Sequence, residues 1–260
     1  MSTLKAGVYQ CDGAGLTPGE RLDKLATAIA GRKLDLVVCP ELYLSGYNID
    51  DKLHSLAEPA DGRLCQATAK LAKAYGTAIV AGFPERDGDV VYNSAICIDA
   101  TGKQIALHRK LAIPPGFERN WFTPGGKMTI FDLGGIKCAL LICYDVEFPE
   151  TVRAACSAGV EIVIAPTALG SQWDQVATRV IPSRAFENGC YMLYSNHAGS
   201  EGELAYSGLS CIVDPDGRDV ARAGSEEELI TAILDKQHVA AARRRLPYML
   251  ELEELVPKLA

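Results

Sequence analysis

Residues 128–150, "MTIFDLGGIKCALLICYDVEFPE", combine two kinds of strand connection in one short stretch. The first part has two apolar runs joined at Gly134-Gly135, which predicts a β-hairpin. The second part passes from the apolar run 139–142 to Pro149, and proline is favoured at the first position of a helix. A hairpin predicts antiparallel pairing, whereas a strand-to-helix junction is typical of parallel pairing. This stretch therefore favours an α/β fold with mixed sheets.

The alternation of strands and helices extends over the whole chain. Periodicity and helix-end signals predict helices over 18–30, 62–75, 149–158 and 173–188, and a helical, charged tail over about 236–260. Apolar runs predict strands over 4–10, 34–40, 77–83, 161–166, 190–196 and 228–234, with further hairpins over 90–110 and around 214–217. No break in composition and no repeat divides the chain. We therefore expect one α/β domain over 1–260, with mixed sheets covered by helices.

The composition excludes several classes of protein. The chain has 260 residues, of which 48% are hydrophobic and 23% charged, as in an ordinary globular protein with a substantial core. The net charge of −7 argues against nucleic-acid and anionic-membrane partners, because both require a positive surface. The basic cluster Arg243–Arg245 is interpreted as a solvated helix end. No segment approaches the roughly 18 apolar residues that a membrane span requires.

The nine cysteines are odd in number and scattered through apolar runs. They form no CxxC pair and no paired Cys/His cluster with zinc-like spacing, so no metal site is predicted. Buried thiols of this kind indicate a reducing compartment. We therefore expect a cytoplasmic protein.

Three residues of complementary chemistry follow predicted strands. Glu41 comes directly after the run 34–40, Lys110 ends the hairpin 90–110, and Cys143 stands between a strand and a helix. Residues at strand ends in α/β folds commonly line the ligand crevice. A carboxylate can take the proton of a thiol, and an ammonium can stabilise the oxyanion of an attacked acyl group. On composition alone, a buried structural role is the favoured interpretation for Cys143, as it is for each of the other eight cysteines.

Four segments in order carry a resemblance to a known family: "CPELYLSGYNI", "HRKLAIP", "FERNWFTPG" and "LLICYDVEFPE". They resemble the signature segments of the nitrilase (carbon–nitrogen hydrolase) superfamily, and the similarity continues through "APTA" and "YSNHAG". The resemblance implies a four-layer αββα sandwich, a homodimer or higher homo-oligomer in which the tail could take part, and no metal or organic cofactor. It also implies a catalytic triad of Glu41, Lys110 and Cys143.

The resemblance assigns a fourth catalytic position to Glu118, which would support the triad. Glu118 lies in the Pro/Gly-rich stretch 111–127, which we expect to be an irregular loop, and loops of this length in compact domains are usually functional. The alternative is a solvated loop glutamate. In the implied mechanism Glu41 takes the thiol proton, Cys143 attacks an amide, and Lys110 holds the oxyanion before a thioester is hydrolysed.

The residues after the nucleophile favour one branch of the superfamily. "CYDVEFPE" and a late "LPYML" are most similar to short bacterial carboxamide amidases, such as 5-aminopentanamide amidases and stereoselective amidases. The expected substrate is a small primary carboxamide. Tyr144 stands where nitrilases usually carry Trp, which disfavours nitrile hydrolysis. Glu147 suggests an amide that bears an amino group, because a carboxylate attracts an ammonium. Equally, Glu147 could belong to the hydrogen-bonding scaffold or cap the following helix.

Several aromatic residues are candidate walls of a substrate pocket: Tyr43, Tyr47, Trp121 and Trp173, with core packing as the alternative for each. Tyr144, next to the nucleophile, is also predicted to bind substrate. His197 follows a strand end, but a lone histidine is more often structural and is left out of the triad. The rival functions are an N-carbamoyl amine amidohydrolase with the same triad, a nitrilase, and a catalytically silent scaffold of the same fold.

Overall fold

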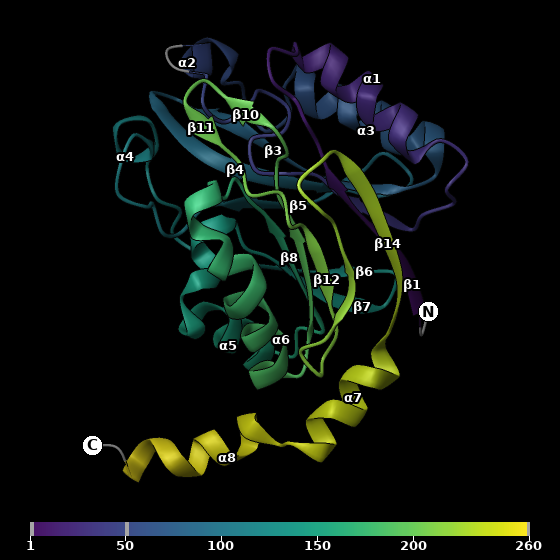
Figure 1. Ribbon diagram of the computed structural model, residues 1–260, viewed down its shortest axis with the longest axis vertical. Coiled ribbons are helices and arrows are strands. Elements are labelled where there is room, and N and C mark those ends of the chain that lie inside the picture. The colour runs from purple at the N-terminus through teal and green to yellow at the C-terminus, as the bar shows by residue number, and fades with distance from the viewer. Residues whose placement is uncertain (1–2, 50–51, 259–260) are drawn as a thin grey trace.

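Two six-stranded mixed sheets form the centre of the molecule in the computed structural model, which describes residues 3–49 and 52–258 (Figure 1). The first sheet has the order β14-β1-β2-β3-β4-β5. Its strands are β1 (Thr3–Gln10), β2 (Leu36–Val38), β3 (Ala78–Asp87), β4 (Val90–Ile98), β5 (Gln104–Arg109) and β14 (Glu228–Asp235). The second sheet has the order β13-β12-β9-β8-β7-β6. Its strands are β6 (Thr129–Leu133), β7 (Ile136–Leu140), β8 (Ile162–Pro166), β9 (Tyr191–Ser195), β12 (Cys211–Val213) and β13 (Asp219–Arg222).

The two sheets pack face to face over a shared apolar core. Alternate residues of the central strands point into it, among them Val8 and Val38 from the first sheet and Ile164 from the second. The residues between them, such as Val37 and Ile79, face the other way and contact helices. The central pairs β1–β2, β2–β3, β7–β8 and β8–β9 are parallel, and both faces of such strands are buried. This explains why 34–40 and 161–166 read as continuous apolar runs.

Helices cover the outer face of each sheet, as Figure 1 shows. The helices α1 (Pro18–Ile29) and α3 (Arg63–Tyr75) bury their apolar sides on the first sheet. The helices α5 (Pro149–Ser157) and α6 (Ile181–Asn188) do so on the second. The smaller elements are α2 (Lys52–Leu56), α4 (Glu118–Trp121), and the two-stranded sheet of β10 (Ser200–Glu201) and β11 (Leu204–Ala205). The predicted αββα sandwich with mixed sheets is confirmed.

Local structure departs from the predicted elements in two places. The stretch 111–127 contains the one-turn helix α4, so it is not wholly irregular. The predicted helix 173–188 is divided into a short 3-10 helix, a π-helix over Val176–Val180 and α6. Pro182 lies in the first turn of α6, and because proline has no N–H, a regular α-helical ladder cannot run through it from the preceding turn.

The C-terminal tail forms the helices α7 (Lys236–Arg245) and α8 (Tyr248–Leu255). The interpretation of the basic cluster as solvated is wrong for Arg243. Its guanidinium donates to the carbonyl oxygens of Val160 and Gly189 at 2.5 and 3.1 Å and thereby binds the tail to the segments that follow α5 and α6. Carbonyl oxygens at and after the C-terminal end of a helix lack partners within the helix and carry partial negative charge, so they attract a cation.

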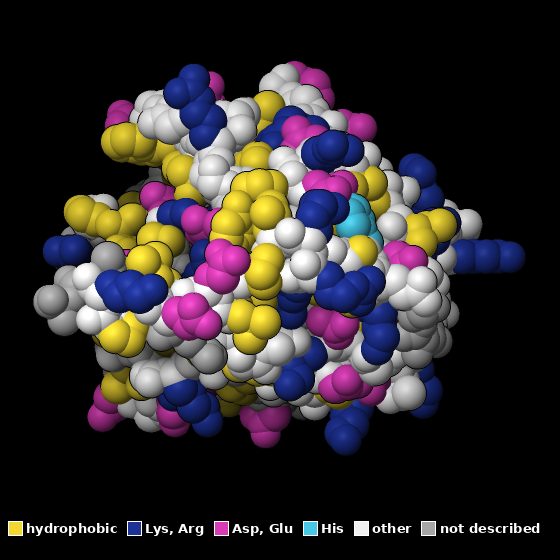
Figure 2. Space-filling view, turned by 90° about the horizontal axis from the view of Figure 1, so that it is seen from below, with side chains coloured by type: hydrophobic (Ala, Val, Ile, Leu, Met, Phe, Trp, Pro, Cys, Tyr) yellow, Lys and Arg dark blue, Asp and Glu magenta, His cyan; other side chains and the backbone are white. Residues whose placement is uncertain are grey.

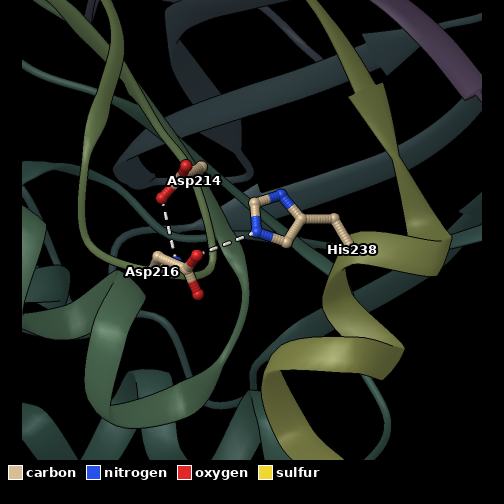
Figure 3. A group of neighbouring side chains, drawn as sticks. All are labelled: Asp214, Asp216 and His238. Carbon is tan, nitrogen blue, oxygen red and sulfur yellow. Dashed lines mark hydrogen bonds and ion pairs between the residues drawn. The ribbon is translucent and has the colours of Figure 1, made fainter. Parts of the chain in front are cut away.

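A second link joins α7 to the turn between β12 and β13. The Nε2 atom of His238 lies 3.2 Å from Oδ2 of Asp216, and Asp214 accepts from the backbone N–H of Asp216 at 2.9 Å (Figure 3). Arg245 pairs with the other oxygen of Asp216. The ion pairs of Asp216 with His238 and Arg245 therefore connect α7 to this turn and hold the base of the tail in place.

Hydrophobic side chains gather among charged ones on the face that carries the tail (Figure 2). On α8 and the turn after it, Leu250, Leu255 and Val256 are exposed. A role of this tail in dimerisation stays a prediction. Within residues 3–49 and 52–258, no helix is long and apolar enough to span a membrane.

Candidate active site

The three residues predicted at strand ends come from both sheets. Glu41 lies three residues after β2, Lys110 directly follows β5, and Cys143 lies three residues after β7. The side chains of Glu41 and Lys110 are fully buried. All nine cysteines are free thiols, and Cys143 is the most exposed of them at 7%, against 3% or less for the others. Cys143 is therefore the most accessible of the nine thiols.

One ammonium group holds two carboxylates at the centre of the site. The Nζ atom of Lys110 donates to Oε1 of Glu41 at 2.7 Å and to both oxygens of Glu118 at 2.7 and 2.8 Å. Glu118 is 1% exposed and stands at the start of α4. The structure thus brings Glu118 into the charged cluster and removes the alternative of a solvated loop glutamate.

Two further side chains complete this cluster. Asn93 donates through Nδ2 to Glu41 at 2.7 Å and to Glu118 at 3.2 Å, and the hydroxyl of Tyr47 donates to Glu118 at 2.6 Å. Tyr47 is among the residues predicted from sequence, whereas Asn93 is not. A polar residue inside the apolar run 90–98 was the available signal for Asn93, since a buried amide requires partners.

The carboxyl group of Glu41 is poised to exchange a proton. Burial raises its pKa, the charge of Lys110 lowers it, and the charge of Glu118 raises it again, so that the pKa lies at about 7. Its Oε2 atom is buried and has no hydrogen-bond partner among the described residues. A carboxyl group with a pKa near 7 and one free oxygen is suited to act as a general base and then as a general acid.

Cys143 begins a 3-10 helix over Cys143–Glu147 and adopts a φ of +46°, in the left-handed region. Burial and the charge of Glu41 raise the pKa of its thiol, and Lys110 counteracts them. The sulfur also interacts with the hydroxyl of Thr167 and the backbone N–H of Ala168. Since the pKa of the thiol is raised, Cys143 needs a neighbouring base before it can act as a nucleophile.

A cavity of about 550 Å³ opens above Cys143. Of the residues predicted to bind substrate, Tyr47, Tyr144, Glu147 and Trp173 line it, together with Phe117. Trp121 is not among its walls: it packs against His54, with ring centroids 4.8 Å apart, and borders a neighbouring cavity of about 40 Å³. Tyr43 is a fully buried core residue. The cavity is therefore walled mainly by aromatic and apolar groups, as small-molecule sites usually are.

Glu147 places a carboxylate in this cavity. Burial raises its pKa, and the charges of Lys110 and Arg184 act in the opposite direction. Among the described residues, no hydrogen bond or ion pair engages its carboxylate, while its backbone carbonyl accepts from Arg184 at 2.7 Å. The side chain is thus available to a ligand in the cavity.

His197 supports the site without lining the cavity. Its Nε2 atom lies 2.8 Å from the backbone carbonyl oxygen of Glu41, and its ring stacks on Tyr206. Burial lowers the pKa of His197. This placement agrees with leaving His197 out of the triad, because it contacts the backbone of the base and not its carboxyl group.

Comparison with known proteins gives one family and a consistent set of relatives. The family model described as carbon–nitrogen hydrolase matches residues 5–244. A hydrolase from the pqqF 5' region of Pseudomonas protegens is 39% identical over 253 residues, which cover 96% of this chain and 89% of the relative. An (R)-stereoselective amidase from a Pseudomonas species is 36% identical over 250 residues, covering 95% and 90%.

Among solved structures, a cysteine-to-alanine variant of an amidase from Nesterenkonia AN1, of the nitrilase superfamily, superimposes with a TM-score of 0.84. It is 28% identical, and the match covers 99% of this chain and 97% of that one. A further structure of the Nesterenkonia amidase, a Glu-to-Gln variant, carries the acetamide moiety of fluoroacetamide bonded to its active-site cysteine.

Proposed function

The chain belongs to the carbon–nitrogen hydrolase family and hydrolyses a carbon–nitrogen bond, and from this premise we propose that it is an amidase for small primary carboxamides. The observation that carries the proposal is the convergence of three groups at one cavity. The thiol of Cys143 lines the cavity, while Glu41 and Lys110 lie buried beneath it and interact electrostatically with the thiol. A nucleophile, a base with one free oxygen and a fixed ammonium are what acyl transfer to a thiol requires.

The first half of the reaction forms a thioester. Glu41 takes the proton of the Cys143 thiol, and the sulfur attacks the carbonyl carbon of the amide. The ammonium of Lys110 and the backbone N–H of Tyr144 stabilise the oxyanion of the tetrahedral intermediate. The carbon–nitrogen bond then breaks, and protonated Glu41 gives its proton to the leaving nitrogen, which departs as ammonia.

The second half regenerates the enzyme. Glu41, again ionised, takes a proton from water, and the resulting hydroxide attacks the thioester carbonyl. The carbon–sulfur bond breaks, the carboxylic acid leaves, and the sulfur of Cys143 recovers its proton from Glu41. Glu118 holds the ammonium of Lys110 through both carboxylate oxygens, so that Lys110 keeps its position through both halves.

The substrates named for similar proteins support this choice. The Pseudomonas relative is an (R)-stereoselective amidase, and the Nesterenkonia amidase was solved in complex with butyramide. A short aliphatic carboxamide is small for a cavity of about 550 Å³, so an acyl group that is longer or carries a substituent also fits.

A second, narrower candidate follows from Glu147. An amino group on the acyl chain would place an ammonium beside the one cavity carboxylate that no described residue engages. The Glu147→Gln variant tests it with ω-amino amides and unsubstituted amides of equal length. We expect kcat/KM for the ω-amino amides to fall about tenfold, with little change for the others. Equal turnover of both series by the wild type would contradict recognition of a substrate cation by Glu147.

A panel of amides, carbamoyl amines and nitriles tests the proposed function, with ammonia release as the readout. Amides should yield ammonia and the acid, whereas a carbamoyl amine would also yield carbon dioxide, which separates the two substrate classes. The Cys143→Ala variant should lose turnover, and intact mass on the wild type should detect the thioester. The matched control is Cys65→Ala, because Cys65 is a buried thiol on α3 remote from the cavity. Undiminished ammonia release from Cys143→Ala would exclude this mechanism.

A further inference from the structure

Asp145 lies two residues after the nucleophile, fully buried and outside the walls of the cavity. Both oxygens of its carboxylate accept hydrogen bonds. Oδ1 accepts from the backbone N–H groups of Leu111 at 2.9 Å and Ala112 at 2.8 Å. Oδ2 accepts from the backbone N–H of Ile142 at 2.9 Å and lies 3.1 Å from Nε2 of His108. Both oxygens of this buried carboxylate therefore have hydrogen-bond partners, as buried polar groups require.

Oδ1 holds the segment after Lys110, whereas Oδ2 holds the residue before Cys143 and also faces His108 on β5. Leu111 directly follows Lys110, and Ile142 directly precedes Cys143. One carboxylate therefore joins the segment that carries the ammonium to the segment that carries the thiol. The two segments leave different sheets, at the ends of β5 and β7, so no strand pairing fixes their separation.

We propose that Asp145 is a positioning residue, whose bridging carboxylate sets the place of the Cys143 thiol relative to the ammonium of Lys110. This inference rests on the proposed amidase function of the triad. It assigns to Asp145 no contact with substrate. Its effect passes through the backbone on either side of the two catalytic residues.

The backbone at Cys143 explains why such a restraint is needed. The left-handed φ of +46° is unfavourable for a residue that has a Cβ atom, so the turn relaxes unless its surroundings hold it. Asp145 holds the turn twice: Oδ2 accepts from the N–H of Ile142, and the N–H of Asp145 donates to the carbonyl oxygen of Ile142 at 2.9 Å. Release of the first bond frees the residue before the nucleophile.

An amide cannot replace this carboxylate. Asparagine has one acceptor oxygen, whereas donors of the backbone face both oxygens of Asp145. Asp145→Asn can therefore hold the Lys110 segment or the Cys143 segment, and its NH2 group then faces an N–H of the other. The base of the Lys110 segment keeps a second anchor, because the N–H of Gly125 donates to the carbonyl oxygen of Lys110 at 2.7 Å. We expect the Cys143 turn to be the part that moves.

The test compares Asp145→Asn with Asp214→Asn. The Asp214 carboxylate accepts from two backbone N–H groups through Oδ1 alone, in the turn between β12 and β13, so asparagine can keep both bonds there and serves as a control outside the site. For each variant the folded fraction is measured by thermal unfolding, and kcat and KM are expressed per folded molecule. We expect Asp145→Asn to lower kcat about 30-fold with KM within about threefold, because small misplacements of reacting groups cost rate and not binding. Asp214→Asn should keep kcat within about twofold.

A purely structural role for Asp145 would lower the folded fraction and leave kcat per folded molecule unchanged, and that result would overturn the proposal. Should Asp145→Asn fail to fold, Asp145→Glu retains the charge and both acceptor oxygens but moves them by one methylene. We expect it to lower kcat about tenfold. Full kcat in Asp145→Glu would also overturn the proposal, because position and not charge is the property at issue.

The rate of Cys143 alkylation by iodoacetamide separates this inference from the proposed function. Alkylation requires the activated thiol but no turnover, so it can be measured even if the wild type hydrolyses none of the amides tested. We expect alkylation of Asp145→Asn to be at least about fivefold slower than that of Asp214→Asn, since a displaced thiol interacts less strongly with the charges of Glu41 and Lys110. Equal alkylation rates would overturn the positioning role, whatever the substrate is.

Discussion

Two buried glutamates of this protein, Glu41 and Glu201, face a cation in opposite electrostatic surroundings. At Glu41 two carboxylates share the single ammonium of Lys110. At Glu201 one carboxylate pairs with the guanidinium of Arg21 at 2.8 Å. The pKa of Glu41 is raised to about 7, whereas that of Glu201 is lowered to about 2. Burial alone would raise both, so the difference comes from the partners.

The electrostatic interaction with His197 lowers the pKa of Glu201 most, and hydrogen bonds lower it further. Oε2 of Glu201 accepts from the backbone N–H groups of Tyr47 and Asn48 at 2.8 and 3.0 Å and from the hydroxyl of Tyr206 at 2.8 Å. Together with the charge of Arg21, these interactions outweigh burial, which raises the pKa of Glu201. Oε2 of Glu41 has no partner among the described residues. A carboxylate used for structure is saturated with donors, whereas one used for proton transfer keeps an oxygen free.

The largest expected effect is the loss of catalysis in Glu41→Gln. We expect kcat to fall about 10³-fold, because the amide cannot take the thiol proton.

The same variant should keep its stability at alkaline pH. The folded pKa of Glu41, about 7, exceeds its ordinary 4.5, so its stabilising contribution is fully present below pH 4.5 and is lost as the pH rises through 7. At pH 8 the variant should therefore unfold at the temperature of the wild type or higher. Ammonia release and thermal unfolding at pH 8 check both parts. A strongly destabilised variant would remove the contrast with Glu201.

Glu201→Gln should show the reverse pattern. The folded pKa of about 2 lies below the ordinary 4.5, so the ionised carboxylate contributes about 3 kcal/mol to the free energy of unfolding. This stability is present above pH 4.5 and is lost as the pH falls through 2. Urea unfolding at pH 7 should show a loss of about that size, with kcat of the folded protein within about tenfold. A variant as stable as the wild type at pH 7 would contradict the structural role.

The sequence predicted the charged residues of the candidate active site, but it did not predict the buried ion pair of Arg21 and Glu201. Glu41, Lys110 and Cys143 each follow an apolar run, and the ordered family segments identified them and Glu118. The pair of Arg21 and Glu201 spans 180 residues and lies in no such segment, so only the folded chain shows it.

The same limit applies to the bridging groups. The predicted hairpin 90–110 places Asn93 beside Lys110, but the position of β4 between β3 and β5 in the first sheet is not readable from local periodicity. Asp145 lies inside a quoted segment, but its partners Leu111 and Ala112 are more than 30 residues away. The break of the helix before Pro182 could have been predicted, since proline rarely continues a helix.

The pH dependence of catalysis tests the raised pKa of Glu41, and here we expect an effect of intermediate size. With Glu41 as the base, kcat/KM should rise with pH and level off above a midpoint of about 7. Asn93 donates to Glu41 and favours its ionised form, so Asn93→Ala should move that midpoint to higher pH and lower kcat about tenfold. Rate measurements between pH 5 and 9 on the wild type and this variant check the shift. A midpoint that stays in place would mean that another group titrates.

The smallest expected effect on kcat belongs to a substitution of Tyr47, which contacts both Glu118 and Glu201. Its backbone N–H donates to Glu201, and its hydroxyl donates to Glu118 at 2.6 Å. Tyr47→Phe removes only the second bond, which steadies Glu118 and through it Lys110. We expect kcat to fall about threefold to tenfold, with stability changed by about 1 kcal/mol or less.

A double-mutant cycle with Glu201→Gln tests whether the groups around Glu118 and Glu201 are coupled through Tyr47. If they are, the loss of kcat in the double variant, expressed as a free energy, should differ from the sum of the losses in the two single variants. Strict additivity would mean that Glu201 and its hydrogen-bond donors only hold the backbone. The group of Glu41, Lys110 and Glu118 would then keep its geometry without them.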